Sequence, residues 1–531
     1  MAKNTFSEVL VSRMKDSSAH GLPNIARAKT VIGRAIWTIL FLAGLALLTW
    51  QVCERCARYW SNEYGVNLDI RFDKEISFPA VTFCNMNPVR ASQFLHLSAD
   101  FQQLFAANSP PSEETRNEFI ANGDVTSVLT GTSNSGGSTT ETIETWNDRA
   151  DPKFFATKDE TSQLREDLTS KISNLTEEKQ IELGHQLETL LLKCEWQGFP
   201  CAPSNFSTFY SSTYGNCFTF GRRNTTELQA SHPGPLNGLV LELFVEQDEY
   251  LADLTDTIGL SLVVHEADKM PLPEDDGILI STGFNTAIGI KKLEISRLGE
   301  PYFECLHQGE QSGEHIQDYY VEKFNVAYSL KTCERSCYQH AVISNCHCMD
   351  PAFPTGKNNT EAPCSSETEK QCQDTTFSMY QKGDVACDCV NRCVEQIYIP
   401  SISMAQWPSD AVSVGVLADI MSTNVEARRH LSRAEDPHEW LERNVAKVQI
   451  FFEEFNYEKI TQYKSYTFGD LLSDIGGQLG LWLGISVLSL FEVVEICSAA
   501  FKRLWAGMRK SGAINRGDLP TPIQILKPPI D

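Results

Sequence analysis

Two uncharged, apolar runs near opposite ends of the chain constrain its fold more than any other feature. The first, Ala35 to Val52, has 18 residues without a charge, and the second, Ile475 to Phe491, has 17. A helix that crosses the hydrocarbon core of a bilayer needs about 20 residues, so each run spans a membrane with help from its flanking residues. We therefore predict two membrane-spanning helices, one at residues 35–60 and one within residues 467–501.

Charge and glycosylation signals predict the orientation of both helices. Residues 1–34 and residues 502–531 each carry a net charge of +4, and the whole chain carries −24, which leaves −32 for the middle. Positive flanks stay cytosolic, so both termini are expected inside the cell and residues 61–466 outside it. A single signal anchor is the simpler interpretation of the first run, and the second run argues against it. Four N-glycosylation sequons lie in the middle, at Asn174, Asn205, Asn224 and Asn358.

The cysteines favour the same compartment. Fourteen of the 17 cysteines lie in the middle region, ten of them from Cys305 to Cys393. An even number in an oxidising compartment predicts seven disulfides, and the spacing alone leaves their pairing open. A zinc site around Cys346-His347-Cys348 is the competing interpretation, which the one-residue gap disfavours. We therefore predict no metal site and no cofactor.

The remaining sequence between the two runs predicts a mixed α+β domain. A Ser/Thr/Gly tract at Thr126–Thr145 is typical of a surface loop. Leucine and isoleucine recur at helical spacing in two segments, 162–196, where we expect about two helices, and 325–346. β-branched and aromatic residues broken by Gly and Asn predict a mainly antiparallel set of strands within 76–88, 207–220, 238–251, 259–268, 277–298 and 445–472.

Several function classes are disfavoured by the residues that the chain lacks. We find no phosphate-binding glycine loop, no zinc-protease motif and no nucleophile elbow, so an enzyme is not predicted. The acidic middle region argues against nucleic-acid binding. It would instead concentrate cations near its surface.

The second apolar run predicts a pore rather than an anchor. It contains four glycines and is followed by two acids that share one helix face: Gly476, Gly477, Gly480, Gly484, Glu492 and Glu495. Glycine lets a helix break, and broken backbone at membrane depth needs protein or water beside it. Rings of carboxylates around a symmetry axis favour cations. One chain with two helices cannot enclose a pore, so this interpretation requires a homo-oligomer. The alternatives are a dry helix bundle with protonated acids, or a helix that simply ends at Phe491.

Several motifs, taken in order, resemble the degenerin/epithelial sodium channel family. They are His20-Gly21, "FPAVTFCN" at Phe78–Asn85, the cysteine-dense block and Gly484-Ile485-Ser486. The resemblance covers nearly the whole chain. It implies an α+β membrane protein that forms a homotrimer, with two transmembrane helices and a disulfide-rich ectodomain made of palm, β-ball, finger (about 89–200), thumb (about 305–393) and knuckle. It also implies an amiloride-sensitive, sodium-selective channel of the plasma membrane that conducts Na⁺.

The resemblance assigns roles to particular residues. Gly484, Ile485 and Ser486 match the selectivity filter, although small residues are common where Ile485 stands. His20 and Gly21 match a cytosolic gating motif that forms a re-entrant turn. Ser473, Asp474 and Gly477 match the pore mouth and the amiloride region, and Glu492 and Glu495 match acids of an inner vestibule. The disulfides implied by the resemblance are Cys84–Cys217, Cys194–Cys201, Cys305–Cys393, Cys333–Cys389, Cys337–Cys387, Cys346–Cys372 and Cys348–Cys364.

The motifs described so far are compatible with more than one stimulus for opening such a channel. Acid-sensing members carry a second acid where this chain reads Ala267-Asp268-Lys269, and protonation relieves repulsion only between close carboxylates. The segment from Ser281 to Tyr302 resembles the invertebrate FMRFamide-gated sodium channels more closely. We therefore expect an extracellular FMRFamide-like peptide, with its site unknown and expected at the finger helices or the Thr126–Thr145 loop. A proton-gated or otherwise gated channel is the alternative, and a non-conducting two-span glycoprotein receptor is the alternative from another class.

Overall fold

A computed structural model describes residues 15, 19–94, 160–222, 228–251, 254–307, 317–357 and 359–486, together with 489, 491 and 498. The chain divides into two compact units, one made of residues 1–66 and 462–531 and the other of residues 67–461. Below, the first is called the helical unit and the second the disulfide-rich unit. The predicted loop at Thr126–Thr145 and the acids Glu492 and Glu495 lie outside the described residues.

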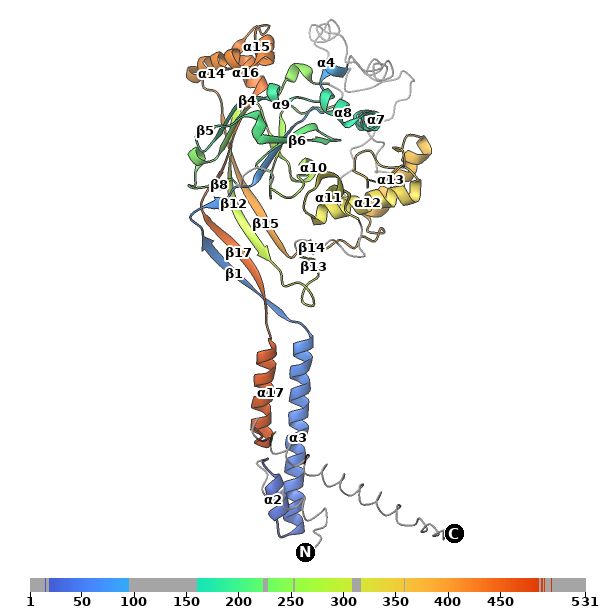
Figure 1. The fold of residues 1–531 in the computed structure, drawn as a ribbon, viewed down its shortest axis with the longest axis vertical. Helices are drawn as coiled ribbons and strands as arrows, with labels where there is room; N and C mark the ends of the chain where they lie inside the picture. The colour runs from blue at the N-terminus through green and yellow to red at the C-terminus, as the bar shows by residue number, and fades with distance from the viewer. Residues whose placement is uncertain are drawn as a thin grey trace, which may run out of the picture. The chain divides into compact units, whose positions relative to one another are not determined.

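The helical unit is built from α2 (Leu22–Arg27), α3 (Val31–Trp60) and α17 (Phe468–Leu483) (Figure 1). The side chain of Thr30 caps α3 by accepting the Gly33 N–H. Among the described residues, α3 is the one helix that is long and apolar enough to cross a membrane. α17 has 16 residues and begins with a capping box between Thr467 and Asp470. It therefore starts before the second apolar run and ends inside it.

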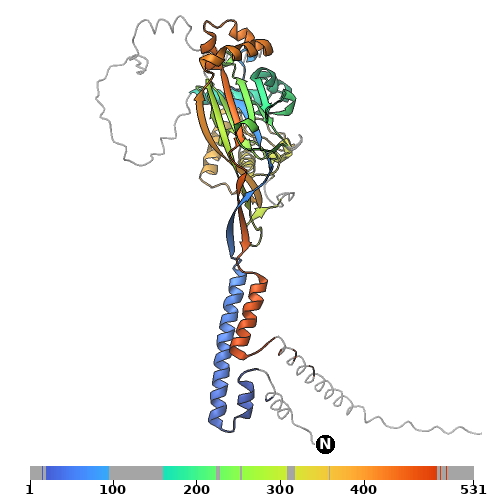
Figure 2. The same cartoon turned by 90° about the vertical axis from the view of Figure 1, so that its left-hand side faces the viewer.

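Two sheets form the core of the disulfide-rich unit. The eight-stranded sheet has the order β1-β17-β12-β16-β9-β4-β5, and β15 pairs with β12. The five-stranded sheet has the order β11-β10-β3-β7-β6. Figure 2 shows the long strands of the larger sheet side by side. The bounds of these strands are β1 Tyr64–Phe72, β3 Ala80–Asn85, β4 Leu191–Trp196, β5 Phe199–Pro200, β6 Phe206–Ser211, β7 Gly215–Phe220, β9 Leu239–Phe244, β10 Leu260–His265, β11 Ile278–Ile280, β12 Phe284–Ser296, β15 Val394–Gln406, β16 Val445–Phe452 and β17 Asn456–Lys464.

One hydrophobic cluster joins the two sheets. Phe83 and Phe218 of the smaller sheet and Leu241 and Ile450 of the larger one belong to it, and all four are almost completely buried. Burying such side chains is the main force that holds the sheets together. Two short ladders complete the strands, β2 (Ile76–Ser77) with β8 (Gln229–Ala230) and β13 (Cys305–Leu306) with β14 (Asn391–Arg392).

Helices cover the sheets in three groups, visible in Figure 1. The first group is α4 (Ala91–Phe94), α7 (Glu160–Ser173), α8 (Glu177–Leu183) and α9 (Leu187–Leu190). The second, which carries most of the disulfides, is α11 (Tyr319–Phe324), α12 (Leu330–Cys346) and α13 (Glu367–Gln381), with α10 (Pro273–Asp276) nearby. The third is α14 (Asp410–Thr423), α15 (Val425–Leu431) and α16 (Pro437–Asn444).

Most predicted elements are found, with three differences. The predicted strand segments all contain strands, and their pairing is mainly antiparallel, although β12 runs parallel to β16 and β17. The segment 162–196 forms helices as predicted, but its last residues form strand β4. These residues pair with β9, and Leu190 and Cys194 are buried in the core. The sequence did not predict α14 to α16.

Seven disulfides stabilise the disulfide-rich unit, and they join the same pairs that the family resemblance implies. Cys84–Cys217 links facing residues of β3 and β7. Cys194–Cys201 closes the β4–β5 hairpin, and Cys305–Cys393 joins the β13–β14 region. The other four bridges secure α12, α13 and the loops around them: Cys333–Cys389, Cys337–Cys387, Cys346–Cys372 and Cys348–Cys364. Cross-links of this kind stabilise short helices that are marginal by themselves.

Candidate functional site

The second apolar run contains a break in its helix. α17 ends at Leu483, and Gly484 adopts a left-handed conformation with φ +62°. The N–H groups of Gly484 and Ile485 turn back to carbonyl oxygens in the last turns of α17, at 3.0 and 3.2 Å. After the break, Ser486 is exposed. The predicted filter residues are therefore the segment where the helix α17 stops and the backbone changes direction.

The predicted gating motif packs directly against this break. The His20 N–H donates a hydrogen bond of 2.6 Å to the carbonyl oxygen of Leu483. A Cβ atom at Gly484 would lie 2.4 Å from Nδ1 of His20, so only glycine leaves room for the imidazole. Gly21 adopts φ +94° and precedes α2, and the ring of Phe41 lies 3.3 Å from where its Cβ would be. The structure thus brings together two motifs that stand at opposite ends of the sequence.

The first half of α17 carries the predicted pore-mouth residues. The Tyr466 hydroxyl donates to Oδ2 of Asp474 at 2.7 Å, and Nε of Arg55 on α3 lies 3.7 Å from the same oxygen. Asp474 is half-buried, whereas Ser473 and Gly477 are exposed. In this arrangement the Asp474 carboxylate has a hydrogen-bond donor and a cation within its own chain.

The glycines of α17 form an open face. A Cβ atom placed on Gly476, Gly477 or Gly480 would meet no atom within 4 Å beyond the helix itself. Leu472 and Leu481 are also more than half exposed. Among the described residues of the helical unit, none covers this side of α17, and its small residues would let another helix approach closely.

Four functional candidates in the helical unit were not identified from the sequence. They are Arg55 and Tyr466, which hold Asp474, and Gln51 and Trp482, which bond to each other. The indole Nε1–H of Trp482 donates to Oε1 of Gln51 at 2.7 Å. One feature of the sequence could have pointed to two of them. Gln51 and Arg55 stand one helical turn apart where the first apolar run ends, and so share one face of α3.

An ion-pair cluster occupies the region around Ala267-Asp268-Lys269. Nζ of Lys269 lies 3.3 Å from a carboxylate oxygen of Glu266 and 4.0 Å from one of Glu395. Arg392 contacts Glu266 at 2.8 Å and Asp268 at 3.6 Å. Each of these three carboxylates therefore has a cation beside it, and Lys269 separates Glu266 from Glu395. An arrangement of opposite charges stabilises the ionised carboxylates rather than their protonated forms.

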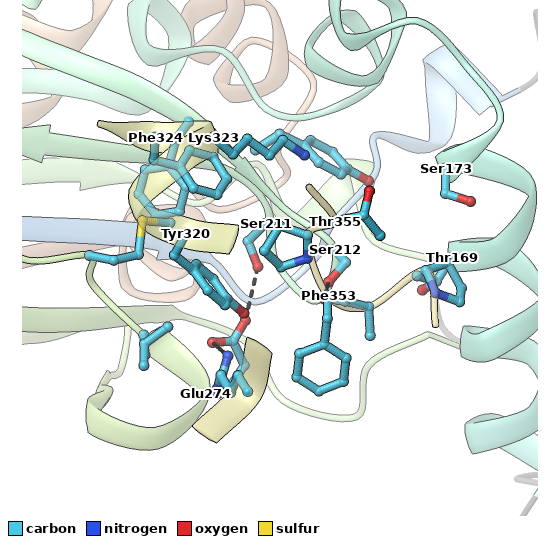
Figure 3. A pocket seen from close by; sticks show the side chains of 18 of the residues that line it. Thr169, Ser173, Ser211, Ser212, Glu274, Tyr320, Lys323, Phe324, Phe353 and Thr355 are labelled. Atoms are coloured by element: carbon cyan, nitrogen blue, oxygen red, sulfur yellow. Dashed lines mark hydrogen bonds and ion pairs between the residues drawn. The ribbon is translucent and has the colours of Figure 1, made fainter. Parts of the chain in front are cut away.

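A cavity of about 150 Å³ lies in the disulfide-rich unit where several elements meet (Figure 3). Its walls come from α7, β6, α10, α11, α12 and the segment 349–355. Aromatic rings from Tyr320, Phe324 and Phe353 line it, together with hydroxyl groups of Thr169 and Ser211 (Figure 3).

Charged groups mark one side of this cavity. The Ser211 hydroxyl donates to Oε1 of Glu274 at 3.0 Å, and Arg335 contacts Oε2 of the same carboxylate at 3.5 Å. Arg335 also pairs with Asp275 at 3.0 Å. The cavity thus combines aromatic walls with a fixed carboxylate, and any occupant would touch helices, a strand and a loop that are distant in sequence.

Two of the predicted glycosylation sites are described. Asn174 and Asn205 are both exposed, and the side-chain Nδ2 of Asn174 donates to the Ser170 carbonyl at 3.0 Å. Asn224 and Asn358 lie outside the described residues. Within the described ranges no group of three or more His, Cys, Asp or Glu side chains is placed to hold a metal ion.

Comparison with known proteins places these features in one family. The family model described as amiloride-sensitive sodium channel matches residues 14–496. The chain is 28% identical to the epithelial sodium channel subunit beta of Homo sapiens, over 93% of this chain and 82% of the relative. It is 32% identical to the degenerin-like protein unc-105 of Caenorhabditis elegans over 63% of this chain and 37% of the relative, and 27% identical to the degenerin-like protein asic-2 of the same organism over 90% and 83%.

Proposed function

The chain belongs to the amiloride-sensitive sodium channel family, and from this premise we propose that three copies form a sodium-selective channel of the plasma membrane that an extracellular peptide opens. The observation that carries the conduction part is the break at Gly484-Ile485-Ser486. Backbone that leaves a helix at membrane depth is tolerated where it is buried in protein or lines water. Three such segments around an axis would supply oxygens that replace the water around Na⁺.

Open surfaces in both units support assembly from several copies. The glycine face of α17 is not covered by any described residue of the helical unit. In the disulfide-rich unit, β15 pairs with β12 alone among the described strands, and five of its apolar side chains are about 40–50% exposed: Val394, Ile397, Ile399, Ile402 and Met404. Large exposed apolar areas of this kind mark interaction surfaces. We assign both surfaces to contacts between copies of this chain.

The proposed topology has two membrane-spanning helices, α3 and the run that includes α17, with both termini in the cytosol. The seven disulfides support an extracellular position for the disulfide-rich unit, because disulfides persist in oxidising compartments. The exposed sequon residues Asn174 and Asn205 agree with that position. In this topology Asp474 lies at the outer mouth, where amiloride would bind near Gly477. Glu492 and Glu495 would line an inner vestibule.

Gating by a ligand is favoured over gating by protons. Proton gating needs carboxylates that repel each other and are relieved by protonation. The cluster at Lys269 instead interposes a cation between Glu266 and Glu395. The cavity of Figure 3 is the ligand site that we propose, since its aromatic walls suit the phenyl ring of a peptide such as an Arg-Phe amide and its hydroxyl groups can bond the amide.

Voltage-clamp recording from cells that express the full chain tests this function. We expect an inward sodium current when an amidated Arg-Phe peptide is applied, block of that current by amiloride, and a small response to pH 5 alone. A large current at pH 5 with none from peptides would instead establish proton gating. If neither stimulus produces a current, and a Ser473→Trp variant designed to hold the pore open also carries none, the result would favour a non-conducting receptor.

Two sets of variants, each with its own control, separate the filter from the ligand site. Ser486→Ala and Ile485→Ala should each change the sodium/potassium permeability ratio, whereas Ser465→Ala, an exposed serine before α17, should leave it unchanged. Thr169→Trp fills the cavity and should abolish the peptide response, whereas Thr368→Trp, on an exposed face of α13, should preserve it. An unaltered permeability ratio in both filter variants would refute the filter assignment.

A further inference from the structure

Gln51 is a polar side chain at the end of the first apolar run, and its contact is made with the second run. Its Oε1 atom accepts the indole N–H of Trp482 at 2.7 Å, across 431 residues of sequence. Polar side chains inside a membrane-spanning helix are unfavourable unless a neighbouring helix provides a partner. Here each group satisfies the other. The hydrogen bond therefore joins α3 to α17 at a defined height and rotation.

This bond is made in the last turn of α17, immediately before the break. Trp482 stands two residues before Gly484, and Leu483 between them accepts the His20 N–H. The helices also approach closely here, because a Cβ atom at Gly44 of α3 would lie 3.4 Å from the carbonyl oxygen of Trp482. The turn that leads into Gly484 is therefore held by side chain and backbone contacts from α3 and from the segment before α2.

The rotation of this turn decides which way the following backbone points. Leu483 is buried while Ser486, beyond the break, is exposed, so the rotation of α17 about its axis sets the side toward which the segment after the break points. At the other end of α17, Arg55 and Tyr466 hold Asp474. Arg55 is one turn after Gln51 on α3, so a single face of α3 holds α17 at two heights.

We propose that Gln51 is a positioning residue for ion selectivity: through its hydrogen bond to Trp482 it fixes the orientation of the segment Gly484-Ile485-Ser486. The inference rests on the proposed function, because it takes that segment as the filter. Gln51 itself touches no permeant ion. It acts by fixing the height and rotation of the last turn of α17.

Permeability ratios of full-length channels test the proposal. Gln51→Leu removes the acceptor, and Trp482→Phe removes the donor and keeps an aromatic ring. Each variant is expected to lower the sodium/potassium permeability ratio by about threefold, the factor that corresponds to an average hydrogen bond between membrane helices. The double variant should lower it no further, because both changes break the same bond. Thr49→Val, an exposed position of α3 whose hydroxyl bonds only within the helix at 2.8 Å, should keep the wild-type ratio.

The outcomes separate this inference from the function on which it rests. The filter assignment itself would be overturned if the wild-type channel were not sodium-selective. It would also be overturned if substitutions at Ser486 and Ile485 left the sodium/potassium permeability ratio unchanged. A selective wild-type channel with sensitive filter residues, and an unchanged ratio in Gln51→Leu, would overturn only the role of Gln51. Additive effects in the double variant would overturn it as well.

Surface labelling accompanies each recording. If Gln51→Leu does not reach the cell surface, Gln51→Met replaces it, because methionine keeps the length and flexibility of the side chain. A methionine variant that is also absent from the surface, combined with wild-type selectivity in Trp482→Phe, would show that the bond serves folding alone and would refute the proposal.

Discussion

Replacing Gly484 by alanine is the sharpest test of the contact between the His20 turn and the helix break. Gly484 has φ +62°, and its absent side chain leaves space that the imidazole of His20 fills. A Cβ atom there would lie 2.4 Å from Nδ1 and 2.5 Å from Cε1 of the ring. Both the backbone conformation and the packing therefore oppose any side chain at this position.

Two contributions set the size of the effect. A left-handed conformation costs an L-residue about 1–2 kcal/mol. Moving the imidazole away costs about 1 kcal/mol more, either through an unfavourable side-chain rotamer or through loss of the hydrogen bond from the His20 N–H to Leu483. Gly484→Ala should therefore destabilise this contact by about 2–3 kcal/mol. In a His20→Ala background the ring is absent, so only the first contribution should remain.

Thermal unfolding of the purified full-length protein in micelles measures this coupling. We expect Gly484→Ala to lower the melting temperature, and His20→Ala combined with Gly484→Ala to lower it by less than the sum of the two single changes. Gly469→Ala is the matched control, because Gly469 is helical and its nearest foreign atom would lie an ordinary 3.5 Å away. Strict additivity of the two changes would refute the packing of His20 on Gly484.

Three further predictions concern other parts of the chain. Burial lowers the pKa of His265 to about 4, and Nδ1 donates to the Glu266 carbonyl while Nε2 bonds Thr82, so stability should fall as the pH drops from about 6.5 to 4. The loss of unfolding free energy should be about 2 kcal/mol, less than the full pKa shift would give, because the side chain keeps some exposure. In His265→Asn the melting temperature should depend less on pH between these values. Lys269→Glu replaces the cation beside Glu266 and Glu395 with a third carboxylate, so like charges repel there and the currents should respond to mild acid; recordings that stay insensitive at pH 6 would contradict this. Gly480→Leu adds bulk to the open face of α17 and should reduce the assembled fraction in size-exclusion chromatography, and a wild-type elution profile would show that this face meets no other copy.

The sequence was informative wherever one residue type or one period carries the physics. Two apolar runs and their charged flanks predict membrane helices and their orientation, because hydrocarbon excludes charge over a fixed thickness. β-Branched and aromatic residues broken by Gly and Asn predicted the strands of both sheets, including β10 and β16. The glycines of the second run predicted a helix break, and the break falls at Gly484.

Prediction failed where local preference and tertiary packing disagree. α14 contains the valine-rich stretch Val412-Ser413-Val414, which by propensity suits a strand. It is helical, and Ile420 packs on Phe244 and Trp440 in a separate core. The prediction for β4 was wrong in the opposite direction. Its leucines favour a helix, but pairing with β9 makes the segment a strand.

What the sequence by itself determined was the class of molecule: its apolar segments, the position of its cysteines, and the residues that can break a helix or carry charge. These depend on properties that each residue has alone or with near neighbours. Only the tertiary structure decided which distant groups meet. It set His20 against Gly484, Gln51 on Trp482 and Lys269 between two carboxylates. Such contacts depend on how separate segments pack together, and sequence spacing does not record that packing.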